Sequence, residues 1–439
     1  MNASYVPYTP DQDLLLPPSL QEWLPDGHLA YFISDTVDSL DLSGFHARYA
    51  GGGPRNQPFH PAMMVKVLLY GYATGTFSSR KLAQGLHENV ALRVLGAGNF
   101  PAHRTLSDFR ANHLEALSDL FVQIVRLARE CGLVKLGTVA IDGTKVKANA
   151  SRHKAMSYKR MLESEQKLRD QIKDLMDRAT AADAAEKDEP ELDIPDEIAR
   201  REQRLKTIRA AKARLEERQR EADLTRGRTE GDERKPRKPD GTPKGGGPYA
   251  RDFGVPEDTA QENFTDPDSR IMKQSNGGFD QSYNGQTAVD AENGIVIAAE
   301  LVQCAADSGE LVPMIDAVEA NLGELPDQTL ADAGYRSEDA FEALAQVDTD
   351  LIVSIGREGR DVARIDAKKA PHTAAMAERL QSQDGRAAYR RRKGIVEPPN
   401  GWIKHVMGFR QFSLRGVGKV RAEWKLVNAA LNLRRMAYL

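Results

Sequence analysis

The stretch that decides the fold is residues 136–142, Leu136-Gly137-Thr138-Val139-Ala140-Ile141-Asp142. Its apolar run predicts a buried strand over 136–141 that ends at Asp142. A second apolar run, Gln328-Thr329-Leu330-Ala331, is followed by Asp332 in the same way. We therefore expect both aspartates at the ends of buried strands, where a fold would hold them rigidly.

A third acid, Glu397, follows the basic stretch Tyr389-Arg390-Arg391-Arg392-Lys393-Gly394-Ile395-Val396, which leads into an expected helix. Carboxylates that gather beside cations suggest metal-assisted chemistry on phosphate. Each acid taken alone is a weak signal, because the chain has 64 acidic residues among 439. Most acids of this kind serve as turn residues or helix caps.

Residues 283–355 alternate strand and helix patterns. The apolar runs 283–290 and 295–304 flank Ala291-Glu292-Asn293-Gly294, and Asn-Gly at such a position predicts a hairpin. Asp307-Ser308 can cap a helix over 311–322. The Asp332 strand, a helix from Ser337 and a strand over 351–355 complete the pattern. Closed by the helix that bears Glu397, this is the order of a ribonuclease H-like α/β domain, a mixed sheet flanked by helices.

The first section, to about Gly132, has a helical pattern. Residues 61–70 are apolar, Ser78-Ser79 can cap one helix, and Thr105 can cap a long amphipathic one that continues to Leu127. Basic residues near the helix starts favour a helix-turn-helix-like DNA reader: Arg80, Lys81, Arg93, Arg104 and Arg110. A plain helical bundle with a solvated basic face explains the pattern equally well.

More than a hundred residues separate the first strand from the hairpin. Heptad-like apolar spacing over 161–175 and 198–215 predicts an antiparallel pair of charged helices, joined by an acidic turn near 189–195. A solvated spacer, a dimerisation arm and a surface that follows DNA are all open for this pair. Residues 225–247 mix Arg, Lys, Gly and Pro without an apolar period, so we expect a disordered or mobile connection there.

These patterns divide the chain into three parts. We expect an all-helical DNA-binding domain over 1–132, and a catalytic α/β domain over 133–150 and 270–439. The helical hairpin and a flexible linker form an insertion over 151–269.

The composition limits the class of protein. The formal net charge of −3 hides an uneven distribution, because acids crowd 183–196 whereas 389–435 is strongly basic. The two cysteines, Cys131 and Cys304, fit reduced core residues better than a disulfide. The N-terminus has no secretory pattern, and the longest apolar stretch, 294–306, is too short and polar to cross a bilayer. We expect a soluble cytoplasmic protein without a membrane partner.

Three blocks resemble those of bacterial insertion-sequence transposases of the DDE superfamily: residues 140–149, residues 330–335 and Val396-Glu397-Pro398. More narrowly, the chain resembles the branch whose third acid lies in a tyrosine, arginine, glutamate, lysine signature. Tyr389, Glu397 and Lys404 fit that signature. Its arginine position falls on Lys393 when counted back from Glu397 and on Arg392 when counted forward from Tyr389. The helical N-terminal section, in which Tyr49-Ala50-Gly51-Gly52-Gly53 comes before Pro61, is similar to the segment that precedes the catalytic core in these enzymes.

The resemblance implies an enzyme that binds the terminal inverted repeats of its element, cleaves DNA and joins the freed 3′-hydroxyl to target DNA. Two Mg²⁺ ions about 4 Å apart, for which Mn²⁺ can substitute, suit this chemistry because hard cations prefer carboxylate oxygens. Asp142 would bridge the two ions, and Asp332 and Glu397 would each complete one metal site.

The same resemblance suggests DNA contacts. Lys393 or Arg392, and Lys404, would bind the backbone, and Tyr389 would position a phosphate. Trp402 is a candidate for stacking on an exposed base, although a core or rim aromatic is the simpler interpretation. Lys145 and Arg336 are further phosphate-contact candidates, with plain surface charges as the simpler interpretation.

The expected partner is double-stranded DNA at the nucleoid, both the element ends and the target, bound by a homodimer. Two alternatives stay open. One is a non-catalytic relative that binds DNA as a repressor. The other is a ribonuclease H-like nuclease without strand transfer.

Overall fold

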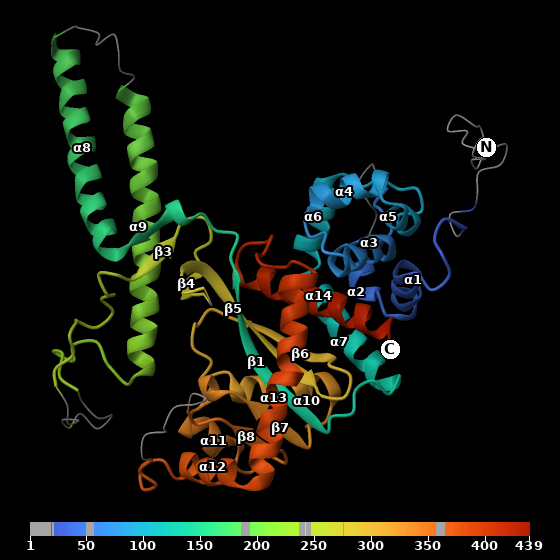
Figure 1. Cartoon of the computed structure of the whole chain (residues 1–439). Helices are drawn as coiled ribbons and strands as arrows, with labels where there is room; N and C mark the ends of the chain where they lie inside the picture. Colours follow the sequence, from blue (N-terminus) through green and yellow to red (C-terminus); the bar gives the residue numbers. More distant parts are fainter. Residues whose placement is uncertain are drawn as a thin grey trace, which may run out of the picture.

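The computed structural model describes residues 19, 22–49, 57–185, 194–236, 242, 247–274, 276–356 and 365–439. In this part of the chain, helices surround a mixed six-stranded sheet, and a pair of long helices projects from it (Figure 1). None of the described helices is both long and apolar enough to cross a membrane.

The sheet has the strand order β4-β5-β1-β7-β8, and β6 also pairs with β5. β1 is antiparallel to β5 and parallel to β7, which is parallel to β8. β4 and β6 share one edge of β5 and pair with different stretches of it. The strands of this sheet are β1 (Thr138–Lys147), β4 (Arg270–Lys273), β5 (Phe279–Asp290), β6 (Val296–Val302), β7 (Gln328–Ala331) and β8 (Asp350–Val353).

Two predictions about these strands have different outcomes. The hairpin is confirmed, since β5 and β6 pair across residues 291–294 and Gly294 has a φ of +62°. The expected end of the first strand at Asp142 is wrong. β5 pairs with β1 as far as Lys147 opposite Ser282, so the strand continues beyond its apolar run.

Helices cover the sheet on both faces. α13 packs against β1, β5, β7 and β8, whereas α10 packs against β5 and β6. α11 begins after the cap Ser337, as expected, but α10 begins after Glu310 and not after Asp307-Ser308. The helical elements are α10 (Leu311–Leu322), the 3₁₀ turn η4 (Ala333–Tyr335), α11 (Glu338–Leu344), α12 (Pro371–Gln381), α13 (Gln383–Gly401), the π-helical turn η5 (Trp402–Val406) and α14 (Val417–Met436).

The N-terminal part is helical, as predicted. Its elements are α1 (Leu29–Ser39), α2 (Ser43–His46), the 3₁₀ turn η2 (Ala47–Tyr49), α3 (Pro61–Ala73), α4 (Ser79–Glu88), α5 (Val90–Leu95), α6 (His103–Asn112) and α7 (Leu114–Glu130). The long helix expected from Thr105 is wrong in two respects. α6 already begins at His103, and the non-helical backbone of His113 separates α6 from α7.

α14 joins the N-terminal helices to the sheet, because it packs against α3, α7 and β6. A buried polar cluster strengthens this contact. Tyr72 of α3 donates to the Glu423 carboxylate of α14 at 2.8 Å, and Arg110 of α6 donates to the Tyr72 hydroxyl at 2.7 Å. Arg110 is 3% exposed. The expectation that it belongs to a basic, DNA-facing surface is therefore wrong. The N-terminal helices and the sheet therefore share one hydrophobic core.

The expected helical hairpin is present. α8 (Tyr158–Ala185) and α9 (Ile194–Thr225) lie side by side and project away from the sheet (Figure 1). At their base, after the 3₁₀ turn η3 (Arg152–Lys154), β2 (Ala155–Ser157) pairs with β3 (Gln261–Asn263). The pair has a small core of its own, formed by apolar residues of both helices: Met161, Leu168, Ile172, Leu205, Ile208 and Leu215.

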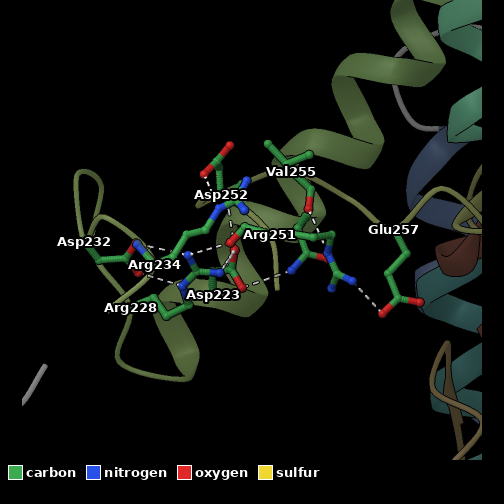
Figure 2. Close-up of polar contacts among 10 residues, drawn as sticks. Asp223, Arg228, Asp232, Arg234, Arg251, Asp252, Val255 and Glu257 are labelled. Carbon is green, nitrogen blue, oxygen red and sulfur yellow. Dashed lines mark hydrogen bonds and ion pairs between the residues drawn. The ribbon is translucent and has the colours of Figure 1, made fainter. Parts of the chain in front are cut away.

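The segment after α9 differs from the disordered connection expected over 225–247. Arg228 is 6% exposed, and its guanidinium donates to Asp232 at 2.7 Å, pairs with Asp223 and lies 4.1 Å from the ring of Tyr249 (Figure 2). The backbone N–H of Tyr249 donates to the carbonyl of Arg234. Residues 226–236 and 247–257 therefore pack around a buried cation. Residues 237–241 and 243–246 lie outside the described residues.

The two cysteines are not core residues, contrary to expectation. Cys131 follows α7, Cys304 follows β6, and both are exposed free thiols. An apolar neighbourhood in the sequence did not predict burial, because both positions lie just beyond the end of an element.

The substitution Arg228→Ala tests whether this cation holds the loop together. It would remove the buried cation that neutralises Asp223 and Asp232, which costs roughly 3 kcal/mol. We expect faster hydrogen–deuterium exchange in residues 226–236. Arg234→Ala is the control, since Arg234 and its partner Asp252 are largely exposed and exposed ion pairs are weak. Unchanged exchange in Arg228→Ala would contradict the role of this cation.

Candidate active site

Asp142 and Asp332 are neighbours across two parallel strands. Ala140 of β1 and Leu330 of β7 form the last registered pair. Continuing this register by two residues places Asp142 opposite Asp332, and adjacent strands lie about 4.8 Å apart. Asp142 is inside β1 and Asp332 directly follows β7. The sheet therefore brings two of the three predicted acids together.

The turn after β7 orients Asp332. Its Oδ1 accepts a hydrogen bond from the backbone N–H of Gly334 at 2.8 Å and caps η4. No cationic side chain of the described residues forms an ion pair with this carboxylate.

Two cations approach Asp142 from the C-terminal helical segment. Arg392 of α13 lies with Nη1 3.7 Å from Oδ1 of Asp142. Arg392 is 7% exposed, and its Nε and Nη1 have no hydrogen-bond partner among the residues that the structure describes. Lys404 of η5 is the second cation: burial lowers its pKa, and the charge of Asp142 partly opposes this effect. The arrangement places a buried, incompletely satisfied guanidinium against the first acid.

The carboxyl of Asp142 holds its proton more tightly than an ordinary aspartate. Burial raises its pKa to about 6, and Arg392 opposes this rise. The nearby charges of Asp332 and Asp307 raise the pKa further, whereas the N–H of Gly143 lowers it. Burial is thus the main reason for the raised pKa of Asp142, and a cation bound beside this carboxyl would favour its charged form.

The raised pKa predicts a pH dependence of stability. The folded state binds the proton more tightly than the unfolded chain, so Asp142 makes the fold less stable as pH rises from 3.8 to about 6. Asp142→Asn cannot ionise and should escape this loss. Measured by denaturant unfolding in EDTA, its stability relative to the natural protein should rise over that window by up to about 3 kcal/mol.

Asp316→Asn controls for the loss of a charge, because Asp316 is exposed on α10. A stability difference for Asp142→Asn that stays constant from pH 3.8 to about 6 would contradict the assignment of the raised pKa.

Asp307 is a fourth acid that sequence reasoning missed as part of the site. Its Oδ1 accepts hydrogen bonds from Asn284 and Gln286 of β5, both at 2.7 Å. Gly143 is paired with Gln286, so these two positions point to the same face of the sheet. Asp142 precedes Gly143 on β1, and because successive side chains of a strand alternate between faces, it points to the other face. Asp307 therefore lies on the face of the sheet opposite to Asp142. In the sequence, Asp307 follows the apolar run that forms β6, and that position predicts a helix cap as readily as a site residue.

A buried network connects Asp307 to the Asp332 turn. Gln286 accepts a hydrogen bond from the hydroxyl of Tyr335, the last residue of η4. Burial raises the pKa of Tyr335 well above its ordinary value, and Asp307, Asp142 and Asp332 raise it further. The hydroxyl therefore stays protonated and donates to Gln286. Through the side chain of Gln286, the network connects the turn that carries Asp332 to β5.

Gly143 makes this network possible, because a Cβ there would lie 2.5 Å from Oδ1 of Asp307 and 2.7 Å from Nε2 of Gln286. We expect Gly143→Ala to lower the free energy of unfolding by about 1–3 kcal/mol through overpacking. Gly394→Ala is the matched control: nothing lies within 4 Å of a Cβ there. In the interior of α13, that alanine should stabilise by about 0.5–1 kcal/mol. Equal stability of Gly143→Ala and the natural protein, measured by chemical unfolding, would contradict this packing.

Glu397 lies on α13, as the sequence predicted, but its side chain is exposed while its neighbour Val396 is fully buried. Among the described residues, no group of three or more His, Cys, Asp or Glu side chains is arranged to hold a metal ion. The structure thus brings Asp142 and Asp332 together, and places Glu397 on the helix that delivers Arg392 to Asp142.

The other predicted contact residues lie in varied environments. Tyr389 is half-buried on α13, with the Arg392 guanidinium 6.0 Å from the centre of its ring, and Lys393 is exposed on the same helix. Trp402 is 37% exposed, and the Arg434 guanidinium lies 5.1 Å from its ring centre.

Two further candidates flank the aspartates. Lys145 is half-buried on β1, three residues beyond Asp142. Arg336 is exposed, and it donates to the carbonyl of Ile355 at 2.9 Å, so part of its role is structural.

Comparison with known families gives two matches. Residues 18–112 match a transposase domain (DUF772), and residues 357–437 match a transposase DDE domain. Together these matches indicate an insertion-sequence DDE transposase. No curated protein matches the chain significantly, and no solved structure does.

The two matches cover different parts of the transposase. The first contains α1 to α6, and the second contains α12, α13, η5 and α14 with Arg392, Glu397 and Lys404. Asp142 and Asp332 lie outside both matched ranges, so only the geometry of the sheet connects them to the matched helices.

Proposed function

We propose that this transposase binds the terminal inverted repeats of its insertion sequence, cleaves DNA phosphodiesters with two bound metal ions, and joins the 3′-hydroxyl ends to target DNA. The observation that carries the proposal is the placement of Asp142 opposite Asp332, with α13 directed at them from the DDE domain match. The strand order β6-β5-β1-β7-β8, with two antiparallel pairs followed by two parallel pairs, supports a ribonuclease H-like core for this chemistry.

DDE transposases generally use divalent metals, and the donors of this site suit them. Asp142 and Asp332 offer only carboxylate oxygens, which hard cations such as Mg²⁺ prefer to nitrogen or sulfur. Asp142, Asp332 and Glu397 would hold the ions, and Glu397 would complete the set from α13. Bound Mg²⁺ or Mn²⁺ would supply Lewis-acid stabilisation of charge on the phosphate oxygens.

The chain's own residues have further roles in this proposal. Arg392 pairs with Asp142, and its Nε and Nη1, which have no hydrogen-bond partner among the described residues, would donate to a phosphate oxygen. Lys404 adds a second cation on the same side. Tyr389 supports the Arg392 guanidinium through its ring. The network of Asp307, Gln286 and Tyr335 would keep the Asp332 turn rigid during the reaction.

The remaining contacts belong to the same proposal. Lys393, Lys145, Arg336 and Trp402 would contact the DNA around the cleaved bond. The N-terminal helices would bind the terminal repeat, with a homodimer pairing the two ends. The N-terminal helices share one hydrophobic core with the sheet. This supports a repeat-binding role for them, because the core would hold the bound repeat at a fixed position relative to the acids.

Substitution of each acid by its amide tests the chemistry. Asp142→Asn, Asp332→Asn and Glu397→Gln should each lower the rate of cleavage of element-end DNA by roughly a hundredfold or more, because metal-held charge stabilisation contributes several kcal/mol. Glu319→Gln, on the exposed side of α10, should cleave at the natural rate. Gel assays with Mg²⁺ measure cleavage, and anisotropy with labelled end DNA in EDTA measures binding.

The outcomes also separate the alternative functions. A natural protein that shifts end DNA but never cuts it would be a repressor-like binder. Cleavage without joined products would indicate a nuclease that lacks strand transfer. Cleavage at full rate by Asp332→Asn would exclude the proposed metal set.

A further inference from the structure

A groove of about 480 Å³ lies at the base of the α8–α9 hairpin. Four basic side chains line it: His153, Lys154, Arg160 and Arg204. None of its described lining residues is acidic. The groove thus has a positive lining without an internal counter-charge.

These basic side chains come from three separate elements. His153 and Lys154 belong to η3, Arg160 lies in the first turn of α8, and Arg204 lies on α9. All four side chains are exposed, and within the described ranges none is in an ion pair with a carboxylate. The fold therefore gathers like charges from distant sequence positions at one surface.

The dipole of α8 adds to the electrostatic repulsion between the positive side chains of the groove. The first turn of α8 contains no acidic residue, so Arg160 lies at the positive end of the helix dipole without compensation. Like charges that converge in this way repel one another unless an anion binds between them. The groove is therefore built to accept negative charge.

The acids near the base of the hairpin do not relieve this charge, because other cations already engage them. Glu165 pairs with Arg169, Arg209 and Lys212. Glu262 is fully enclosed, and it pairs with Arg214 and Arg218. Because Glu165 and Glu262 pair with these other cations, they do not neutralise the groove, which stays a separate positive site on the hairpin.

The groove also has apolar surface. Met156, Ile208 and Phe264 line it beside the cations. A sugar–phosphate backbone combines charged oxygens with the less polar faces of its sugars, so it matches both parts of this lining. A small free anion would use only the cations.

The position of the groove connects it to the active site. β1 carries Asp142 and continues to Lys147, and the chain then enters η3 and β2 at the groove. The five residue steps from Asp142 to Lys147 span about 17 Å, which is roughly half of the ~34 Å helical turn of B-form DNA, and the first groove residue, His153, follows six positions later. A duplex that follows β1 from the acids would therefore reach the groove with its flanking backbone.

We propose that this groove binds the phosphate backbone of double-stranded DNA that flanks the cleaved bond. The identity of the partner rests on the proposed function, whereas the position of the contact rests on the groove itself. The hairpin then serves as a DNA-holding arm, in preference to a solvated spacer.

The test compares two triple variants of the full chain. Lys154→Ala, Arg160→Ala and Arg204→Ala together remove three groove cations. Lys167→Ala, Lys173→Ala and Lys206→Ala together remove three exposed lysines from the same two helices outside the groove. Anisotropy of a fluorescein-labelled duplex of random sequence is measured over a salt series without divalent metal, and circular dichroism checks that both variants fold.

Each lost phosphate contact lowers the slope of log affinity against log salt by about one. The groove variant should therefore lose about two to three from this slope and bind more weakly, while the control variant keeps most of the natural slope. An unchanged slope in the groove variant, an equal loss in the control, or no DNA binding by the natural protein would overturn the proposal. Because the titration involves no cleavage, a chain that binds through the groove but never cuts DNA would contradict only the proposed function.

Discussion

The parallel pairing of β1 with β7 is the constraint on which the rest of the site depends. Its register places Asp142 opposite Asp332 although 190 positions separate them in the chain. Two carboxylates on adjacent strands repel each other, and partial burial increases the cost. Burial is the main cause of the raised pKa of Asp142, and the charge of Asp332 adds to the rise. Everything else near the site either offsets the negative charge or keeps the two strands in position.

The C-terminal helices supply the positive charges that offset the two carboxylates, and they hold these charges in position. α13 brings Arg392 to Asp142, and η5 brings Lys404 to the same side. α14 then continues into the core shared with the N-terminal helices, where Glu423 meets Tyr72 and Arg110. A single path of packed elements therefore connects the N-terminal helices with the acids. The insertion is different, since its helices have a small core of their own.

The sequence predicted which helices and strands form better than it predicted where they end and which polar side chains they bury. Periodicity and turn residues identified the β5–β6 hairpin, the helix after Ser337 and the paired helices of the insertion, because each of these signals is local. The extension of β1 to Lys147 depends on pairing with β5, and the break at His113 depends on tertiary packing. Neither is encoded in the apolar pattern of its own segment. Arg228 shows the same limit, since a basic, proline-rich stretch carries no sign that two aspartates will bury one of its arginines.

The candidate site follows the same pattern. The strand-end motifs led to Asp142 and Asp332, whose proximity is then a consequence of strand register. Asp307 escaped notice because its partners, Asn284 and Gln286, lie on a different strand, and helix-cap chemistry explained it equally well. Glu397 was found through the basic stretch that precedes it and through the family signature, yet neither signal orients its side chain toward the aspartates.

The most direct test of the central claim, that Asp142 and Asp332 share a bound cation across the β1–β7 pair, is a double-mutant cycle on Mn²⁺ affinity. Electron paramagnetic resonance can titrate free Mn²⁺ against the natural protein, Asp142→Asn, Asp332→Asn and the double variant. If the two carboxylates share an ion, each single variant should lose most of the affinity and the double variant should lose little more. Independent, additive losses, or unchanged Mn²⁺ binding in either single variant, would contradict a shared site.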